Sequence, residues 1–209
     1  MSAKEIDLQT LVGQIRDRSS SKRRAAAKHL RRLANPEAGP ALLQALRSEL
    51  QDARTWETQY QMVMALAHCG FREALPLLMD LSKRSFKHTM VLTAVGDALV
   101  RLGRATEHDS RPLIAALGQD CDWCLSDGAL RATAMLQLRF DRETCASIVE
   151  SVRSKPMEAL QFWAVAACAG WSGPAVGRFV ESCLLSSRAD IREAAELAKR
   201  GAYKKWNPL

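Results

Sequence analysis

Residues 62–81, MVMALAHCGFREALPLLMDL, decide the fold of this chain. An apolar segment ends at Gly70, and Pro76 opens a second apolar segment soon afterwards. Glycine closes a helix easily because it adopts the left-handed conformation at low cost. Proline is tolerated in the first turn of a helix, where its missing N–H would have no partner anyway. The stretch therefore predicts the end of one helix, a sharp turn and the start of another.

The same punctuation recurs along the whole chain. Helix-closing residues follow apolar segments at Asn35, Gly70, Gly103, Gly170 and Gly201, and apolar segments open at Pro40, Pro76, Pro112 and Pro174. The spacing of about 33 residues is typical of helical repeats, and the one missing mark falls near Arg139–Asp141. We predict a single all-α domain over residues 1–209 with about six antiparallel helix pairs. The predicted repeats are 4–35, 38–70, 72–103, 109–139, 141–170 and 172–201, followed by a tail at 202–209.

Two sequence patterns resemble the HEAT-repeat family. One is the Pro-Leu-Leu-x-x-Leu opening at residues 76–81, and the other is the alanine-rich second-helix segment at 24–30, 131–134 and 190–195. HEAT repeats commonly carry an Asp and an Arg near the start of the second helix. The resemblance implies a right-handed α-solenoid whose second helices line a concave surface. The fifth repeat departs from the pattern, since it lacks the opening proline and has Gln161 where an Arg is expected.

Composition narrows the class of protein. Hydrophobic residues make up 47% of the chain and charged residues 25%, which is ordinary for a folded protein. Alternating β-branched runs are nearly absent, so strands are not expected. The segment from Lys4 to Arg18 is amphipathic and charged, unlike a signal peptide, and the longest apolar stretch, Phe162 to Trp171, is too short to span a bilayer. We therefore expect a cytoplasmic protein with no membrane partner.

The net charge of +7 is distributed unevenly. Eight basic residues lie between Arg16 and Arg32, and four more, Lys199, Arg200, Lys204 and Lys205, lie near the other end. Basic ends are compatible with an acidic partner. The alternative is that these residues are solvated faces of the terminal repeats, which need a polar outer surface in any solenoid.

The cysteines and histidines do not form a recognisable catalytic or metal-binding motif. Cys69 and Cys168 precede closing glycines in the same repeat position, which predicts buried core residues. Cys121 and Cys124 have metal-like spacing, but no second pair supplies the other two zinc ligands. The four histidines are scattered, and no glycine-rich phosphate loop is present. We expect no metal and no cofactor.

Trp123 and Asp127 are the candidate site for catalysis. They lie four residues apart and share one face if both belong to a helix. The pair is similar to the Trp-x-x-x-Asp pattern of the alkylpurine DNA glycosylases built from HEAT-like repeats. That resemblance implies that Asp127 stabilises an oxocarbenium-like sugar and that Trp123 contacts the damaged nucleotide. The alternative is that Asp127 is a helix cap or surface residue, that Trp123 packs between repeats, and that the chain has no catalytic residue.

Helical periodicity also predicts an extended binding groove along the second helices. The residues expected near it are Arg24, Lys28, Glu57, Gln61, Asp97, Arg131, Glu158, Arg192 and Glu196. Because their charges are mixed, we predict a non-enzymatic scaffold or adaptor that binds a partner protein or peptide. The alternative is a nucleic-acid-binding protein that uses Arg23, Arg24, Lys28, Arg31 and Arg32. The aromatic and basic tail either folds back as a cap or serves as a docking peptide.

Overall fold

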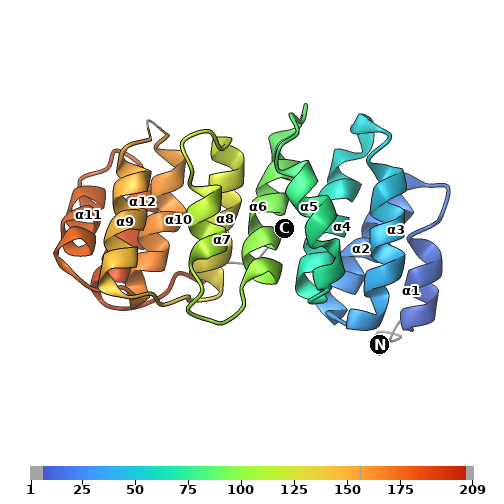
Figure 1. The fold of residues 1–209 in the computed structure, drawn as a ribbon, viewed down its shortest axis with the longest axis horizontal. Helices are drawn as coiled ribbons and strands as arrows, with labels where there is room; N and C mark the ends of the chain where they lie inside the picture. The colour runs from blue at the N-terminus through green and yellow to red at the C-terminus, as the bar shows by residue number, and fades with distance from the viewer. Residues whose placement is uncertain (1–6, 156, 206–209) are drawn as a thin grey trace. The chain divides into compact units, whose positions relative to one another are not determined.

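The computed structural model describes residues 7–155 and 157–205, and these residues form α-helices and short 3₁₀ segments without any strand (Figure 1). The chain divides into two compact units, unit one (residues 1–103) and unit two (residues 104–209). Unit one contains α1 (Leu8–Gln14), α2 (Ser20–Leu33), α3 (Gly39–Glu49), α4 (Trp56–His68), α5 (Leu75–Leu81) and α6 (Thr89–Gly103). Unit two contains α7 (Arg111–Ala116), α8 (Trp123–Met135), α9 (Arg142–Arg153), α10 (Ala159–Ala167), α11 (Pro174–Leu184) and α12 (Ala189–Lys199). The 3₁₀ segments are η1 (Pro36–Ala38), η2 (Ala53–Thr55), η3 (Arg72–Ala74) and η4 (Cys168–Gly170).

The predicted all-α fold of about six helix pairs is confirmed. In unit one the second helices α2, α4 and α6 pack side by side, and each first helix packs on the second helix of its own pair. Unit two repeats this arrangement with α8, α10 and α12, and its first helices α9 and α11 also contact each other. The right-handed sense of the stack and the single continuous domain stay predictions.

The ends of the helices follow the predicted chemistry at most places. Prolines occupy the first turns of α3, α5, α7 and α11. Gly70 and Gly201 are left-handed, with φ of 68° and 67°. The first repeat closes at Ala34 (φ 51°) and not at Asn35, whose side chain instead accepts a hydrogen bond at the start of η1. Near Arg139–Asp141, where the sequence has no helix-closing glycine, Gln137 adopts the left-handed conformation (φ 53°) instead.

Gly170 has a packing role and not the conformational role that the spacing predicts. It lies in η4 and is not among the glycines with positive φ. A Cβ atom at this position would overlap the hydroxyl of Tyr203, so glycine is needed here for the close approach of the tail.

The second helices are buried on more sides than the single apolar face of an amphipathic helix. In α4, which lies between α2 and α6 and is also covered by α3, every residue from 58 to 67 is buried. Gln61, expected on the outer side, is therefore buried, and Nη1 of Arg31 donates a hydrogen bond of 3.2 Å to its side chain. Thr93 and Asp97 of α6 are also buried, although Asp97 is expected near the groove, and Asp97 pairs with Arg101 one turn later. Helical periodicity does not predict this burial, because these polar groups have partners inside the stack.

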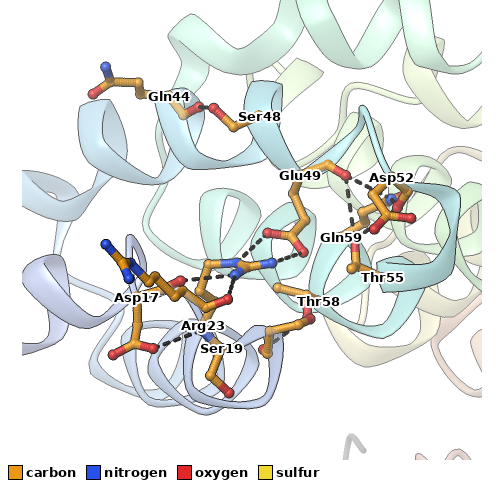
Figure 2. Close-up of polar contacts among 12 residues, drawn as sticks. Asp17, Ser19, Arg23, Gln44, Ser48, Glu49, Asp52, Thr55, Thr58 and Gln59 are labelled. Atoms are coloured by element: carbon orange, nitrogen blue, oxygen red, sulfur yellow. Dashed lines mark hydrogen bonds and ion pairs between the residues drawn. The ribbon is translucent and has the colours of Figure 1, made fainter.

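Arg23, the fourth residue of α2, ties together three parts of unit one, as Figure 2 shows. Its Nε and Nη2 donate to both carboxylate oxygens of Glu49, at the end of α3, over 2.6 and 2.8 Å. Its Nη1 donates to the backbone carbonyls of Asp17 and Arg18 in the preceding loop, over 2.9 and 3.0 Å. The side chain of Glu49 is only 3% exposed, so this is a bidentate ion pair at the edge of the core.

The fourth residue of the second helix binds backbone carbonyls in three other repeats, and we call this place the clamp position. Gln59 of α4 donates to the carbonyls of Glu49 and Asp52, over 3.1 and 2.9 Å. Ser126 of α8 donates to the carbonyl of Ala116, over 2.8 Å. Arg192 of α12 donates to two loop carbonyls, over 2.7 and 2.8 Å. The HEAT-like arginine thus satisfies the backbone before its helix, and the expectation that Arg192 also contributes to a groove stays a prediction.

We predict that the Arg23→Ala substitution lowers the free energy of unfolding by about 2–4 kcal/mol, because it leaves the buried Glu49 carboxylate without its partner. The matched control is Arg54→Ala, which removes an exposed pair with Asp52 and is expected to leave the free energy of unfolding nearly unchanged. Urea titrations followed by circular dichroism measure both. Equal effects of the two substitutions would contradict the structural role of Arg23.

Candidate functional site

A pocket with a volume of about 410 Å³ lies at the N-terminal ends of the second helices of unit two. We call it the aromatic pocket. It is lined by Trp123 and Asp127 of α8, Ala159, Phe162 and Trp163 of α10, Arg188 and Asp190 at the start of α12, and Lys204 of the tail. Because α8, α10 and α12 pack side by side, residues from three successive repeats meet here.

Aromatic side chains form two walls of the pocket. The rings of Phe162 and Trp163 contact each other edge to face, with centroids 4.8 Å apart, and both residues are buried. Trp123, the first residue of α8, is 37% exposed and one of a few large hydrophobic residues exposed among the described ones. The two buried rings and the exposed Trp123 beside them together form an aromatic surface that a ligand can cover.

Asp127 belongs to the pocket and is not a helix cap. The N-cap of α8 is Asp122, whose side chain accepts a hydrogen bond of 2.8 Å from the backbone of Cys124. Trp123 and Asp127 both line the aromatic pocket. The alternative that Asp127 is the helix cap is therefore wrong, and a catalytic role for the two residues stays a prediction.

The environment of Asp127 disfavours its charge. Burial raises the pKa of its carboxyl group from 3.8 to about 6, although the positive charges of Arg131 and Arg188 act in the opposite direction. Arg188 is already engaged, because its guanidinium donates to both carboxylate oxygens of Asp190 over 3.1 and 2.6 Å. Burial of this carboxyl group disfavours its ionised form, and the group lies in a pocket. Residues with these two properties are candidates for functional residues.

The described part of the tail folds back onto unit two, as the cap alternative predicts. The backbone N–H of Ala202 donates to the carbonyl of Leu197, and Tyr203 packs against Gly170. Lys204 forms an ion pair of 2.5 Å with Glu193 of α12, and its ammonium lies 6.0 Å from the centroid of the Phe162 ring. Its side chain is only 16% exposed. The last predicted tail residues, 206–209, lie outside the described residues.

The structure separates the predicted groove residues into different environments. Gln61, Asp97 and Arg131 are buried, so they do not present their side chains to a partner. Glu57, Glu158 and Glu196 are exposed, and Arg24 and Lys28 are half-buried, with Arg24 paired to Glu57. A binding role for these five residues stays a prediction.

The basic cluster proposed for nucleic acid is largely engaged within unit one. Arg23 binds Glu49, Arg24 pairs with Glu57, and Arg31 is 5% exposed with Gln61 as a partner. Lys28 is half-buried and Arg32 is exposed. A count of basic residues in the sequence overestimates the charge available to phosphate groups, because it does not show which of them have internal partners.

Sequence reasoning missed most of the pocket. The site residues that the sequence predicts do not include Phe162, Trp163, Arg188, Asp190 or Lys204. A signal existed for the aromatic pair, because it follows the start of a second helix, as Trp123 does in the previous repeat. Recognising it would have required aligning the starts of α8 and α10 in space.

The cysteines are mainly core residues. Cys69 and Cys168 are 2% and 3% exposed, and burial raises the pKa of the Cys69 thiol to about 11. Cys121 donates to the carbonyl of Ala115 over 3.3 Å. Within residues 7–155 and 157–205, no three His, Cys, Asp or Glu side chains gather as metal ligands would. The helices of these residues also include none whose length and hydropathy would let it cross a membrane.

Comparisons with known proteins agree with this architecture of helix pairs. The family model for HEAT repeats matches residues 43–134, and the model for the PBS lyase HEAT-like repeat matches residues 22–48. Together they cover more than half of the chain, which is thus an α-helical repeat protein. The protein belongs to the HEAT-repeat family.

Solved structures show the fold alone. An engineered protein from the Northeast Structural Genomics Consortium is 17% identical, with 94% of this chain and 98% of that chain covered and a TM-score of 0.51. A second engineered protein is 20% identical over 95% and 98% of the two chains, with a TM-score of 0.46. A designed armadillo repeat protein is 16% identical over 93% and 99%, with a TM-score of 0.44. No curated protein sequence matches this chain.

We predict that Asp127→Asn raises the free energy of unfolding at pH 7.5. The folded-state pKa of about 6 lies above the ordinary value of 3.8, so the folded state holds this proton more tightly than the unfolded state does. The stabilisation is complete below about pH 4 and is lost as the pH rises to about 6. Since Asn does not ionise, the variant avoids this loss, which is on the order of 2 kcal/mol.

The matched control is Asp190→Asn, which breaks the pair with Arg188 and is expected to lower stability slightly. Urea titrations at pH 4.5 and 7.5 measure both variants. If Asp127→Asn were instead destabilising at pH 7.5, its carboxylate would be part of a stabilising contact and the pocket would be a structural feature.

Proposed function

We propose that this protein is a non-enzymatic scaffold or adaptor that binds a partner protein or peptide, with the aromatic pocket as the anchor of the interface. The observation that carries the proposal is the meeting of Trp123, Phe162 and Trp163 from two successive repeats around one concave site. Aromatic side chains in such sites commonly contribute most of the binding free energy of a protein interface.

The size and position of the pocket support this function. A volume of about 410 Å³ accommodates one side chain or a small group and not an extended ligand. The neighbouring second-helix surface of unit two is available for the rest of a partner segment, since repeat proteins bind extended partners along such surfaces. Charged residues of both signs at the rim would set the register of the partner.

Site-specific photo-crosslinking tests this proposal. A photoreactive benzoylphenylalanine at position 123 is expected to trap a partner, and the same residue at position 54 in the exposed η2 segment serves as control. The partner is then purified and titrated by calorimetry against wild-type protein and Trp123→Ala. We expect stoichiometric binding that weakens at least tenfold in the variant. A partner that crosslinks equally at both positions, or binds Trp123→Ala with wild-type affinity, would contradict the proposal.

A second candidate is DNA alkylpurine glycosylase activity, and one specific observation favours it. Trp123 and Asp127, the two residues of the glycosylase-like pattern, face the same pocket as Phe162 and Trp163. Aromatic walls can stack on a base rotated out of the duplex. The carboxylate of Asp127, ionised above about pH 6, would stabilise the positive charge on the sugar while water adds to C1′ and the base leaves.

Release of an alkylated base from duplex DNA tests this candidate. Asp127→Asn is expected to lower the rate at least 100-fold if Asp127 stabilises the developing charge. Asp190→Asn, at the rim of the same pocket, is expected to change the rate by roughly twofold or less, as for an exposed ion pair. An equal rate in wild-type protein and Asp127→Asn would eliminate the glycosylase function.

A further inference from the structure

We infer that the aromatic pocket binds a lysine side chain of a basic partner segment, and that Lys204 of the chain's own tail, which lines the pocket, holds the contacts with Phe162 and Glu193 when the partner is absent. The inference rests on the proposed partner-binding function and adds the chemistry of the group that the pocket recognises. It also assigns the described part of the tail an autoinhibitory role.

The position of Lys204 is the first observation. Although lysine is usually solvated, this side chain is 16% exposed, and its ammonium group lies against the Phe162 ring and pairs with Glu193. The backbone preceding it is anchored by the hydrogen bond from Ala202 and by Tyr203 against Gly170. The tail therefore delivers a lysine into the pocket as a ligand would.

The charges around the pocket are the second observation. Three carboxylates, from Asp127, Glu158 and Asp190, interact with the single guanidinium of Arg188, and Asp190 alone already satisfies it with a bidentate pair. Glu193 has Lys204 as its partner. If the tail leaves, Glu193 loses its ion pair with Lys204, while Asp127, Glu158 and Asp190 share the charge of Arg188, so the site favours a cation in place of Lys204.

The aromatic walls are the third observation. An ammonium group is attracted to the faces of tryptophan and phenylalanine rings, and the attraction increases when water is excluded. Lys204 lies over Phe162, whereas Trp123 stays 37% exposed at the edge of the pocket. A lysine on a partner segment that crosses the face of unit two would cover Trp123 as well. The partner segment thus gains a contact that the described tail leaves open.

The same charges argue against a phosphate group at this place. A phosphate near Arg188 would also approach the carboxylates of Asp127, Glu158 and Asp190, which repel it. An extended nucleic-acid partner would need a continuous basic surface, and the pocket supplies Lys204 and a guanidinium that is already paired. A basic peptide is the partner that fits the site.

Fluorescence anisotropy with defined peptides tests the inference. The probe is a fluorescein-labelled octapeptide with two central lysines flanked by glycine, serine and alanine, and its matched peptide has alanine in place of both lysines. Each is titrated at low ionic strength with full-length wild-type protein, Lys204→Ala and Lys199→Ala. Lys199 is the control because it is an exposed lysine of α12 that pairs with Glu181, away from the pocket residues.

We expect Lys204→Ala to tighten binding of the lysine peptide roughly three- to tenfold, since the internal competitor is held by one ion pair and one aromatic contact. Lys199→Ala is expected to match the wild type, and the alanine peptide is expected to bind none of the three measurably. Adding Asp127→Asn to Lys204→Ala is expected to weaken binding of the lysine peptide severalfold.

Four results would overturn the inference. One is an equal affinity of Lys204→Ala and Lys199→Ala for the lysine peptide, and another is equal binding of the two peptides. The third is a labelled single-stranded oligonucleotide that binds the wild type and loses affinity in Lys204→Ala, which would assign Lys204 to phosphate contacts. A partner trapped at position 123 that binds Lys204→Ala and wild type equally would overturn the lysine site and leave the scaffold function standing. Lysine-peptide binding without any partner trapped at position 123 would overturn the scaffold function alone.

Discussion

Side-by-side packing of the second helices is the constraint on which the other features of each unit depend. A helix such as α4, enclosed by α2, α3 and α6, has no free side on which to place polar groups, so Gln61 is buried against Arg31. The loops that lead into the second helices are half-buried or exposed, and several of their backbone carbonyls accept hydrogen bonds from the helix that follows. The clamp position supplies the donors through a guanidinium, an amide or a hydroxyl in four of the repeats.

The aromatic pocket includes one of the two second helices that have no donor at the clamp position. This position is Leu92 in α6 and Phe162 in α10, and Phe162 lines the pocket beside Trp163. The fifth repeat also lacks an opening proline and has Gln161 where an arginine is expected. A repeat that departs from the structural pattern of its neighbours is where side chains are free to serve a ligand, and Asp127 and Lys204 meet the aromatic pair at this place.

The charge that this protein presents to a partner differs from the charge of its sequence, because several basic side chains have partners within the fold. The eight basic residues between Arg16 and Arg32 suggest a surface for an acidic partner. In the structure, Arg23 and Arg31 satisfy buried groups and Arg24 pairs with Glu57, while at the pocket of unit two the single guanidinium of Arg188 interacts with three carboxylates. The local field at the candidate site thus favours a cation, although the chain as a whole carries a positive net charge.

Proline, glycine and apolar spacing act over a few residues, so the helices and their pairing can be predicted from the sequence, although the closing residues Ala34 and Gln137 do not follow the pattern. The spacing also places Trp123 and Asp127 on one face, since residues four apart in a helix are neighbours. The burial of Gln61 and Asp97, and the meeting of Trp123, Phe162 and Lys204 in one pocket, depend on tertiary packing. These residues are about 40 positions apart in the chain, and packing between repeats brings them together in a way that no local pattern encodes.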